Sequence, residues 1–157
     1  MSNETYREVY KMLREEQSKH TYFLLAAVGA AIGFAVTQTQ NSVISWSQLP
    51  LGIAVFSWGM SFFFGCRHIM YVNSNLYANA ELINVELGNN PMVGTNPQMI
   101  AAASEGIREA FEENSNRSSR FAKLQFYTLL IGAIMFLIWH VTEMILRLHP
   151  IIKNVNQ

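Results

Sequence analysis

The hydrophobic residues of this chain are concentrated in long uncharged stretches, and polar segments separate these stretches. No Asp, Glu, Lys or Arg occurs in residues 21–66 or 124–142. Residues 21–37, 49–66 and 124–144 are each apolar over the roughly 17 to 25 residues that a helix needs to cross the hydrocarbon core of a bilayer. A soluble domain of this size rarely buries three helices that are apolar on every side. The pattern therefore predicts an all-α membrane protein with three spanning helices.

The segments outside the spans carry apolar residues three or four positions apart, which is the spacing of one helix face. Residues 1–20, 67–87 and 97–123 all follow this spacing. Because each apolar face must find a partner out of water, we expect three long helices that span the bilayer and continue as one cytoplasmic helical bundle or stalk. Residues 1–20 could instead lie on the lipid surface. Such helices usually carry an excess of Lys and Arg, which this segment lacks.

The boundaries between these elements carry local signals. Gly88 predicts a helix stop, and Asn96 followed by Pro97 predicts a helix N-cap with proline at the first helical position. The helical pattern weakens at residues 114–119, where we expect either a break or a polar contact. The predicted organisation is a cytoplasmic amphipathic helix at 1–20, a transmembrane hairpin at 21–66, a cytoplasmic helical hairpin at 67–123 with a loop at 88–96, a third span at 124–147 and a short external tail at 148–157.

The Lys and Arg residues are distributed unevenly about the spans. Of the eleven in the chain, only Arg147 and Lys153 follow the third span, and the loop between the first two spans has none. Cytoplasmic segments near spanning helices are enriched in Lys and Arg. The sequence therefore predicts a multi-pass protein of the plasma (inner) membrane, with the N-terminus in the cytoplasm and the C-terminus outside.

The composition excludes several kinds of chemistry. The eleven acidic residues balance the eleven basic ones, and all of the acids are Glu. A chain without Asp has no aspartyl dyad, no Ser-His-Asp triad and no EF-hand loop. The single cysteine, Cys66, allows no internal disulfide and no multi-cysteine metal site. A neutral chain is also unsuited to nucleic-acid binding. No P-loop, nucleophile elbow or HExxH motif occurs, so we expect no enzyme, no catalytic residues and no cofactor.

Small residues in the first two spans indicate close helix packing. Gly29 and Gly33 form a GxxxG motif, and Ser57 and Ser61 lie four residues apart in the second span. Small side chains let helix backbones approach each other in lipid. Two interpretations follow from this pattern: either the first two spans pack against each other within one subunit, or these residues form an interface between subunits of an oligomer.

Polar side chains in or beside the spans are candidates for a gate or another functional contact. Arg67 and His68 lie at the inner end of the second span, whereas His140, Glu143 and Arg147 share a face of the third helix near its outer end. A Glu-x-x-His pair occurs in di-iron helical bundles, but those sites need more carboxylates at one depth than this chain has. We therefore expect no metal. The simplest role for Glu143 and Arg147 is an ion pair at the level of the lipid headgroups.

Two functions fit this organisation, and the first fits slightly better than the second. The first is a small oligomerising integral membrane protein that acts as a membrane effector or channel-like subunit and is controlled through its cytoplasmic stalk. The second is a non-conducting membrane anchor or accessory subunit. The expected partners are the lipid bilayer, other copies of the chain and, for the anchor, a soluble cytoplasmic protein. A transporter or intramembrane enzyme fits less well because the spans lack broken helices and polar clusters at mid-depth.

Overall fold

The computed structural model describes the backbone of residues 3–40 and 45–155, and the side chains of residues 12, 15, 16, 18–40 and 45–146. No strand occurs in these backbone ranges, so the predicted all-α class is confirmed. The elements are α1 (Asn3–Thr39), a short 3-10 helix η1 (Trp46–Gln48), α2 (Leu49–Glu86) and α3 (Pro97–Val155).

Each of the three α-helices contains a segment that is long and apolar enough to cross a membrane, as the sequence predicted. Helices α2 and α3 comprise 38 and 59 residues. At 1.5 Å per residue they are about 57 and about 88 Å long. The hydrocarbon core of a bilayer is only about 30 Å thick, so both helices are much longer than one crossing requires.

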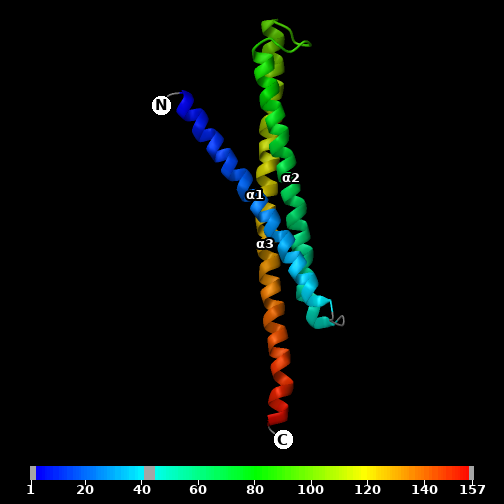
Figure 1. Ribbon diagram of the computed structural model, residues 1–157. Helices are drawn as coiled ribbons and strands as arrows, with labels where there is room; N and C mark the ends of the chain where they lie inside the picture. The colour runs from blue at the N-terminus through cyan, green and yellow to red at the C-terminus, as the bar shows by residue number, and fades with distance from the viewer. Residues whose placement is uncertain (1–2, 41–44, 156–157) are drawn as a thin grey trace. The chain divides into compact units, whose positions relative to one another are not determined.

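The chain divides into two compact units, which are described separately. Unit 1 comprises residues 1–63 and 125–157, and unit 2 comprises residues 64–124. In unit 1, α1 crosses the unit-1 segments of α2 and α3 (Figure 1). The three helices share one apolar core, which excludes water from their contact. Its buried residues are Val28 and Ala35 from α1, Leu51, Ala54 and Trp58 from α2, and Trp139 from α3.

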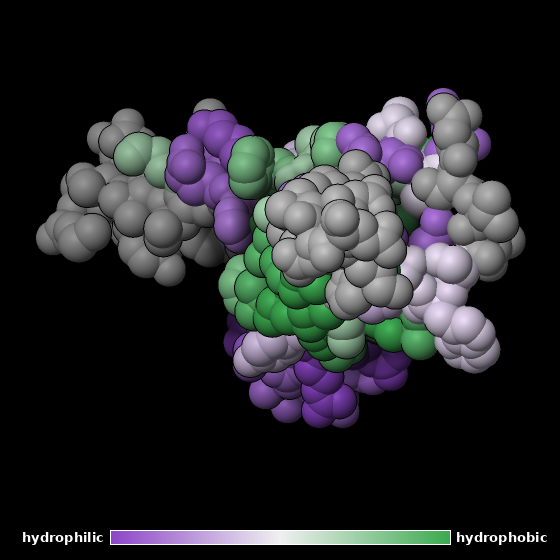
Figure 2. Space-filling model, turned by 90° about the horizontal axis from the view of Figure 1, so that it is seen from below, coloured by the Kyte–Doolittle hydropathy of each residue, from purple (hydrophilic) through white to green (hydrophobic). Residues whose placement is uncertain are grey.

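The outer surface of unit 1 is also apolar. Phe23, Phe56 and Leu137 are 68%, 70% and 61% exposed, and each comes from a different helix. Hydrophobic side chains, coloured green, are visible on the surface in Figure 2. Water disfavours so much exposed apolar surface, whereas lipid does not. The surface of unit 1 is therefore suited to a bilayer.

Unit 2 is a helical hairpin in which the second half of α2 and the first half of α3 lie side by side (Figure 1). The N–H groups of Gly88 and Asn89 donate to the carbonyls of Val85 and Asn84, and Gly88 has a φ of 70°. This is a Schellman motif, which needs a residue that tolerates a positive φ, and glycine at position 88 meets this need. The helix stop that the sequence predicted is thus confirmed.

The second boundary of the hairpin is also as predicted. Helix α3 begins at Pro97, and the side-chain Oδ1 of Asn96 accepts a hydrogen bond of 3.0 Å from the N–H of Gln98. Residues 114–119 do not break α3. Instead, Asn114 Nδ2 donates to Ser74 Oγ of α2 at 3.1 Å. Of the two expectations for this polar stretch, a polar contact is the correct one.

Candidate functional site

The interior of unit 1 contains a polar contact between α2 and α3. Ser61 is completely buried, and its Oγ donates a hydrogen bond of 2.8 Å to the backbone carbonyl of Gln125. Ser57 is buried one turn before it. A hydroxyl in lipid needs such a partner because water is absent. The two serines therefore lie on the face of α2 that packs within the subunit.

The glycines of the GxxxG motif lie on the exposed surface of α1, unlike the two buried serines of α2. Gly29 and Gly33 are exposed, and a Cβ built on either would meet nothing within 4 Å among the described residues. The buried core residues of α1 are Val28 and Ala35, and Ala31 and Ile32 also pack against the core. Packing of the first two spans through Gly29 and Gly33 within one subunit was one interpretation of the sequence, and this geometry is against it.

A different glycine provides the close approach inside the subunit. At Gly132 of α3, an added Cβ would overlap the indole ring of Trp58 and lie 3.1 Å from the carbonyl oxygen of Ala54. Trp58 is 5% exposed and also contacts the ring of Phe136, with centroids 5.7 Å apart. Sequence reasoning did not single out Gly132 because it is not part of a repeated small-residue motif.

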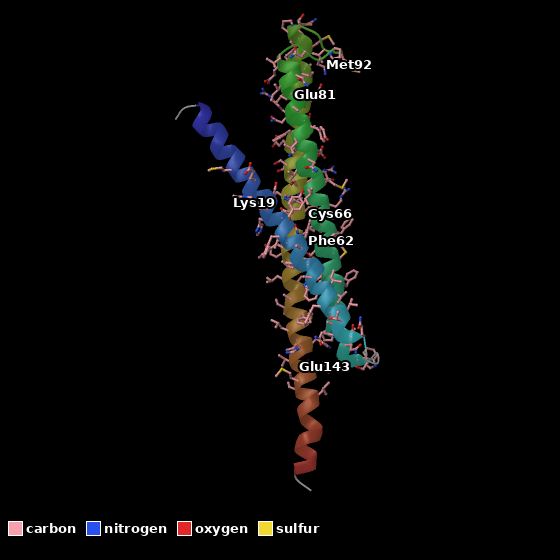
Figure 3. All side chains as sticks on the ribbon, in the orientation of Figure 1. Lys19, Phe62, Cys66, Glu81, Met92 and Glu143 are labelled. Atoms are coloured by element: carbon pink, nitrogen blue, oxygen red, sulfur yellow. The ribbon has the colours of Figure 1, made fainter. Side chains whose placement is uncertain are left out.

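One of the polar residues near the end of the third predicted span, Glu143, contacts η1. Glu143, labelled in Figure 3, accepts a hydrogen bond of 3.0 Å from Ser47 Oγ, and the hydroxyls of Ser47 and Ser45 are 2.7 Å apart. His140 is exposed, and its ring stacks on Phe136 at a centroid distance of 6.5 Å. The side chain of Arg147 lies outside the described residues. Glu143 thus has a partner that sequence reasoning did not identify.

His68 joins the two helices of unit 2. It is 3% exposed, and its Nδ1 lies 2.9 Å from Ser118 Oγ and 3.0 Å from the Ser118 carbonyl oxygen. Both residues are buried, so this contact fixes the register of α2 against α3. The sequence singled out His68 as a candidate gate or polar membrane residue, and the structure gives it a polar contact between two helices, which sequence reasoning did not predict.

Arg67 lies against two aromatic rings of the same unit. Its guanidinium carbon is 5.3 Å from the ring centroid of Tyr71 and 5.7 Å from that of Phe121. These two rings stack with an interplanar angle of 11°. Its Nη2 also donates to the Tyr71 hydroxyl at 3.1 Å. Cation–π contacts and the hydrogen bond together hold the guanidinium in place.

A second arginine approaches the same hydroxyl. A hydrogen bond from Arg117 lowers the pKa of Tyr71, although partial burial of the phenol opposes this, and the pKa of Arg117 is raised in turn. Arg117 also pairs with Glu113 one turn earlier on α3. The spacing of Arg67 and Tyr71, four residues apart on one helix, is a sequence signal that could have indicated their contact. The contact of Arg117 on α3 with Tyr71 on α2 could not be predicted from residue spacing.

The structure therefore places the candidate polar residues in separate clusters. Glu143 and Ser47 belong to unit 1, and Arg67 and His68 belong to unit 2. Across the described side chains, no group of three or more His, Cys, Asp or Glu residues is arranged to hold a metal ion. Comparisons of the chain with protein-family models, curated proteins and solved structures find no match.

Proposed function

We propose that this chain is the subunit of a homo-oligomeric integral membrane protein that acts as a non-conducting anchor and presents unit 2 to a soluble cytoplasmic partner. The observation that carries the homo-oligomer is the exposed row of small residues on α1, and the observation that favours an anchor is the arrangement of polar groups inside unit 1. We place the protein in the plasma (inner) membrane with its N-terminus in the cytoplasm and its C-terminus outside, because the distribution of Lys and Arg favours this orientation.

The row of small residues on α1 is suited to a second copy of the chain. Ala26, Gly29, Ala30 and Gly33 are all exposed and recur at spacings of three and four, which places them on one face of the helix. In lipid, helix association depends on close van der Waals contact, and small residues allow it. Neither glycine meets another part of its own subunit among the described residues, so this face is free for a partner.

The arrangement of polar groups favours an anchor over a conducting subunit. The buried hydroxyl of Ser61 on α2 donates to a backbone carbonyl of α3, and the Thr142 hydroxyl donates to a carbonyl of its own helix. The interior of unit 1 is closed where Trp58 packs on Gly132. An ion path needs a continuous row of polar groups or water. In the predicted spans of α2 and α3, the exposed positions are instead mostly large apolar side chains.

A membrane effector or channel-like subunit, controlled through the cytoplasmic helices, is the second candidate. The observation that favours it is again on α1, whose small residues are followed by exposed Thr37 and Gln38. If several copies surround an axis with α1 innermost, these residues line the opening. Conduction in this case requires an oligomer, because one subunit has a closed interior.

The oligomer is tested with the full chain in a neutral detergent or nanodisc. The mass of the wild type is expected to be a multiple of 17.8 kDa. Gly33→Leu is expected to shift the population to monomer. The matched control is Gly59→Leu, since Gly59 is also exposed with open space around it but lies on α2. A monomeric wild type, or equal dissociation by both variants, would contradict the proposal.

Dye release from liposomes separates the two candidate functions. Vesicles that hold the wild-type oligomer and stay sealed support the anchor. Release of dye by the wild type that Gly33→Leu abolishes and Gly59→Leu preserves supports the effector.

A further inference from the structure

Four basic side chains of unit 2 lie where α2 and α3 leave the predicted spans. Residues 64–80 and 114–124 contain no acidic residue. Glu113 lies just outside them, and in the described part of unit 2 it is the carboxylate that pairs with one of the four bases. This end of unit 2 therefore carries a local excess of positive charge. We call it the basic patch, and its basic residues are Arg67, Arg117, Arg120 and Lys123.

The two arginines at the centre of the basic patch are close together. Arg67 Nη2 donates to the Tyr71 hydroxyl at 3.1 Å, and the guanidinium of Arg117 approaches the same phenol from α3. Tyr71 is a neutral group and Glu113 pairs with Arg117 alone, so neither offsets the charge of Arg67. An anion bound between the two arginines would do so, and two guanidinium groups supply a fork geometry that matches the oxygens of a phosphate.

Arg67 is prepared for such a ligand. Its guanidinium is held over Tyr71 and Phe121, which limits its freedom before anything binds. In the described structure its one polar contact is with the Tyr71 hydroxyl. A guanidinium has five N–H donors, so most of them are available. The side chain is half-buried rather than freely mobile in solvent, which lowers the entropy lost on binding.

The position of the basic patch along the helices corresponds to the headgroup layer. Arg67 directly follows the second predicted span, and Lys123 directly precedes the third. From Arg67 to Tyr71 the helix rises about 6 Å. The headgroup layer on each side of a bilayer is about 5 to 8 Å thick. Stacked aromatic rings beside basic residues are typical of this layer, where apolar and charged groups meet.

We propose that the basic patch binds the phosphate group of anionic lipid headgroups in the leaflet next to unit 2. Arg67 and Arg117 hold the phosphate oxygens, and Arg120 and Lys123 contribute attraction at longer range. Four to eight Lys and Arg residues beside a span are sufficient to select anionic lipids. The inference rests on the proposed membrane insertion, but it does not depend on the oligomer.

The test is lipid binding to the full chain in neutral detergent, followed by native mass spectrometry. Phosphatidylglycerol is titrated against phosphatidylcholine, which carries the same phosphate with a compensating positive charge. Each base near the surface contributes roughly a fivefold preference for an anionic lipid. The double variant Arg67→Gln/Arg117→Gln is therefore expected to lose about 25-fold of the wild-type preference for phosphatidylglycerol.

Arg108→Gln is the matched control. Arg108 is an exposed arginine of the same unit, but it pairs with Glu86 and is nine positions from Arg117 on α3. The control is expected to keep the wild-type preference. Arg67→Lys keeps the charge but loses the fork, so an intermediate preference is expected. Helix content measured by circular dichroism confirms that the variants are folded.

Several outcomes overturn the inference. Equal preference in the wild type and the double variant, or an equal loss in Arg108→Gln, shows that the basic patch is not the site.

A second arm of the experiment adds inorganic phosphate without lipid. Binding of free phosphate that is as tight as binding of phosphatidylglycerol overturns the assignment to lipid. Flotation with phosphatidylcholine vesicles measures insertion separately, so a chain that inserts without any lipid preference contradicts this inference and leaves the proposed function standing.

Discussion

The indole ring of Trp58 lies so close to Gly132 that no side chain at residue 132 fits beside it. Trp58 is on α2 and Gly132 is on α3, so this contact sets the separation of the two helices within unit 1. The carbonyl oxygen of Ala54, one turn earlier, borders the same space. A large aromatic side chain placed against a glycine gives the tight contact on which helix association in lipid depends.

We expect Gly132→Ala to destabilise unit 1 by about 1 to 3 kcal/mol, because the added methyl group overlaps Trp58 and forces the helices apart. The change is measured by unfolding in mixed micelles, followed by circular dichroism and tryptophan fluorescence. Gly59→Ala is the control, since a Cβ at Gly59 meets nothing within 4 Å. Equal effects of the two variants would show that the contact does not limit the helix separation.

The polar contact between His68 and Ser118 predicts an asymmetry between two neighbouring serines. Ser118→Ala removes the hydroxyl 2.9 Å from the buried imidazole but keeps the Ser118 carbonyl oxygen 3.0 Å away, so we expect a cost of about 0.5 to 1.5 kcal/mol. Ser119 is exposed, so Ser119→Ala is expected to change stability by less than about 0.5 kcal/mol. Hydrogen exchange of the amides in residues 64–124 measures both variants. Similar exchange in the two would contradict a structural role for the contact.

The hydrogen bond from Ser47 to Glu143 predicts an energetic coupling between η1 and α3. In a double-mutant cycle of Ser47→Ala and Glu143→Ala, we expect a coupling of about 1 kcal/mol, because a half-buried carboxylate accepts the bond. Unfolding in mixed micelles supplies the four free energies. Glu143→Gln keeps an acceptor oxygen and is expected to preserve most of the coupling. Additive single effects would argue against the contact.

Tyr71 is expected to ionise at a lower pH than an ordinary tyrosine. The hydrogen bond from Arg117 lowers its pKa from the usual 10.0 in the folded chain. The phenol therefore contributes no stability below its folded pKa, an increasing amount as the pH rises from there to about 10, and its full amount above. Tyrosine carrying ¹³C at Cζ reports the titration by NMR, and Tyr71→Phe assigns the signal.

Arg117→Gln removes the main cause of this shift, so the titration midpoint of Tyr71 is expected to rise towards 10. Arg108→Gln serves as the control and is expected to leave the midpoint unchanged. An unchanged midpoint in Arg117→Gln would show that Arg117 does not contact the phenol in solution.

The predicted orientation is tested with single cysteines in a Cys66→Ser background. Ser115→Cys is expected to react only with reagents applied to the cytoplasmic side, whereas Ser42→Cys and Asn156→Cys are expected to react from outside. These expectations follow from the small number of Lys and Arg residues after the third span. Labelling of Asn156→Cys from the cytoplasm would overturn the orientation.

Local signals in the sequence were sufficient to predict the helical class, the three apolar segments and the ends of the hairpin. Gly88 and Asn96 act on backbone groups of their own neighbourhood, and the Schellman motif and the N-cap are satisfied within a few residues. Such interactions depend little on the rest of the chain. The same holds for the length of each apolar segment, which hydropathy alone reports.

Only the tertiary structure decided which face of each predicted spanning helix turns inward. In water, a buried face is apolar and an exposed face is polar, so periodicity identifies the core. In a spanning helix both faces are apolar, so this information is lost. Gly29 and Gly33 were therefore singled out for packing and Gly132 was not, yet of these three glycines Gly132 is the one that meets another helix among the described residues. For the same reason, the partners of Glu143 and His68, which lie 96 and 50 residues away, required the fold.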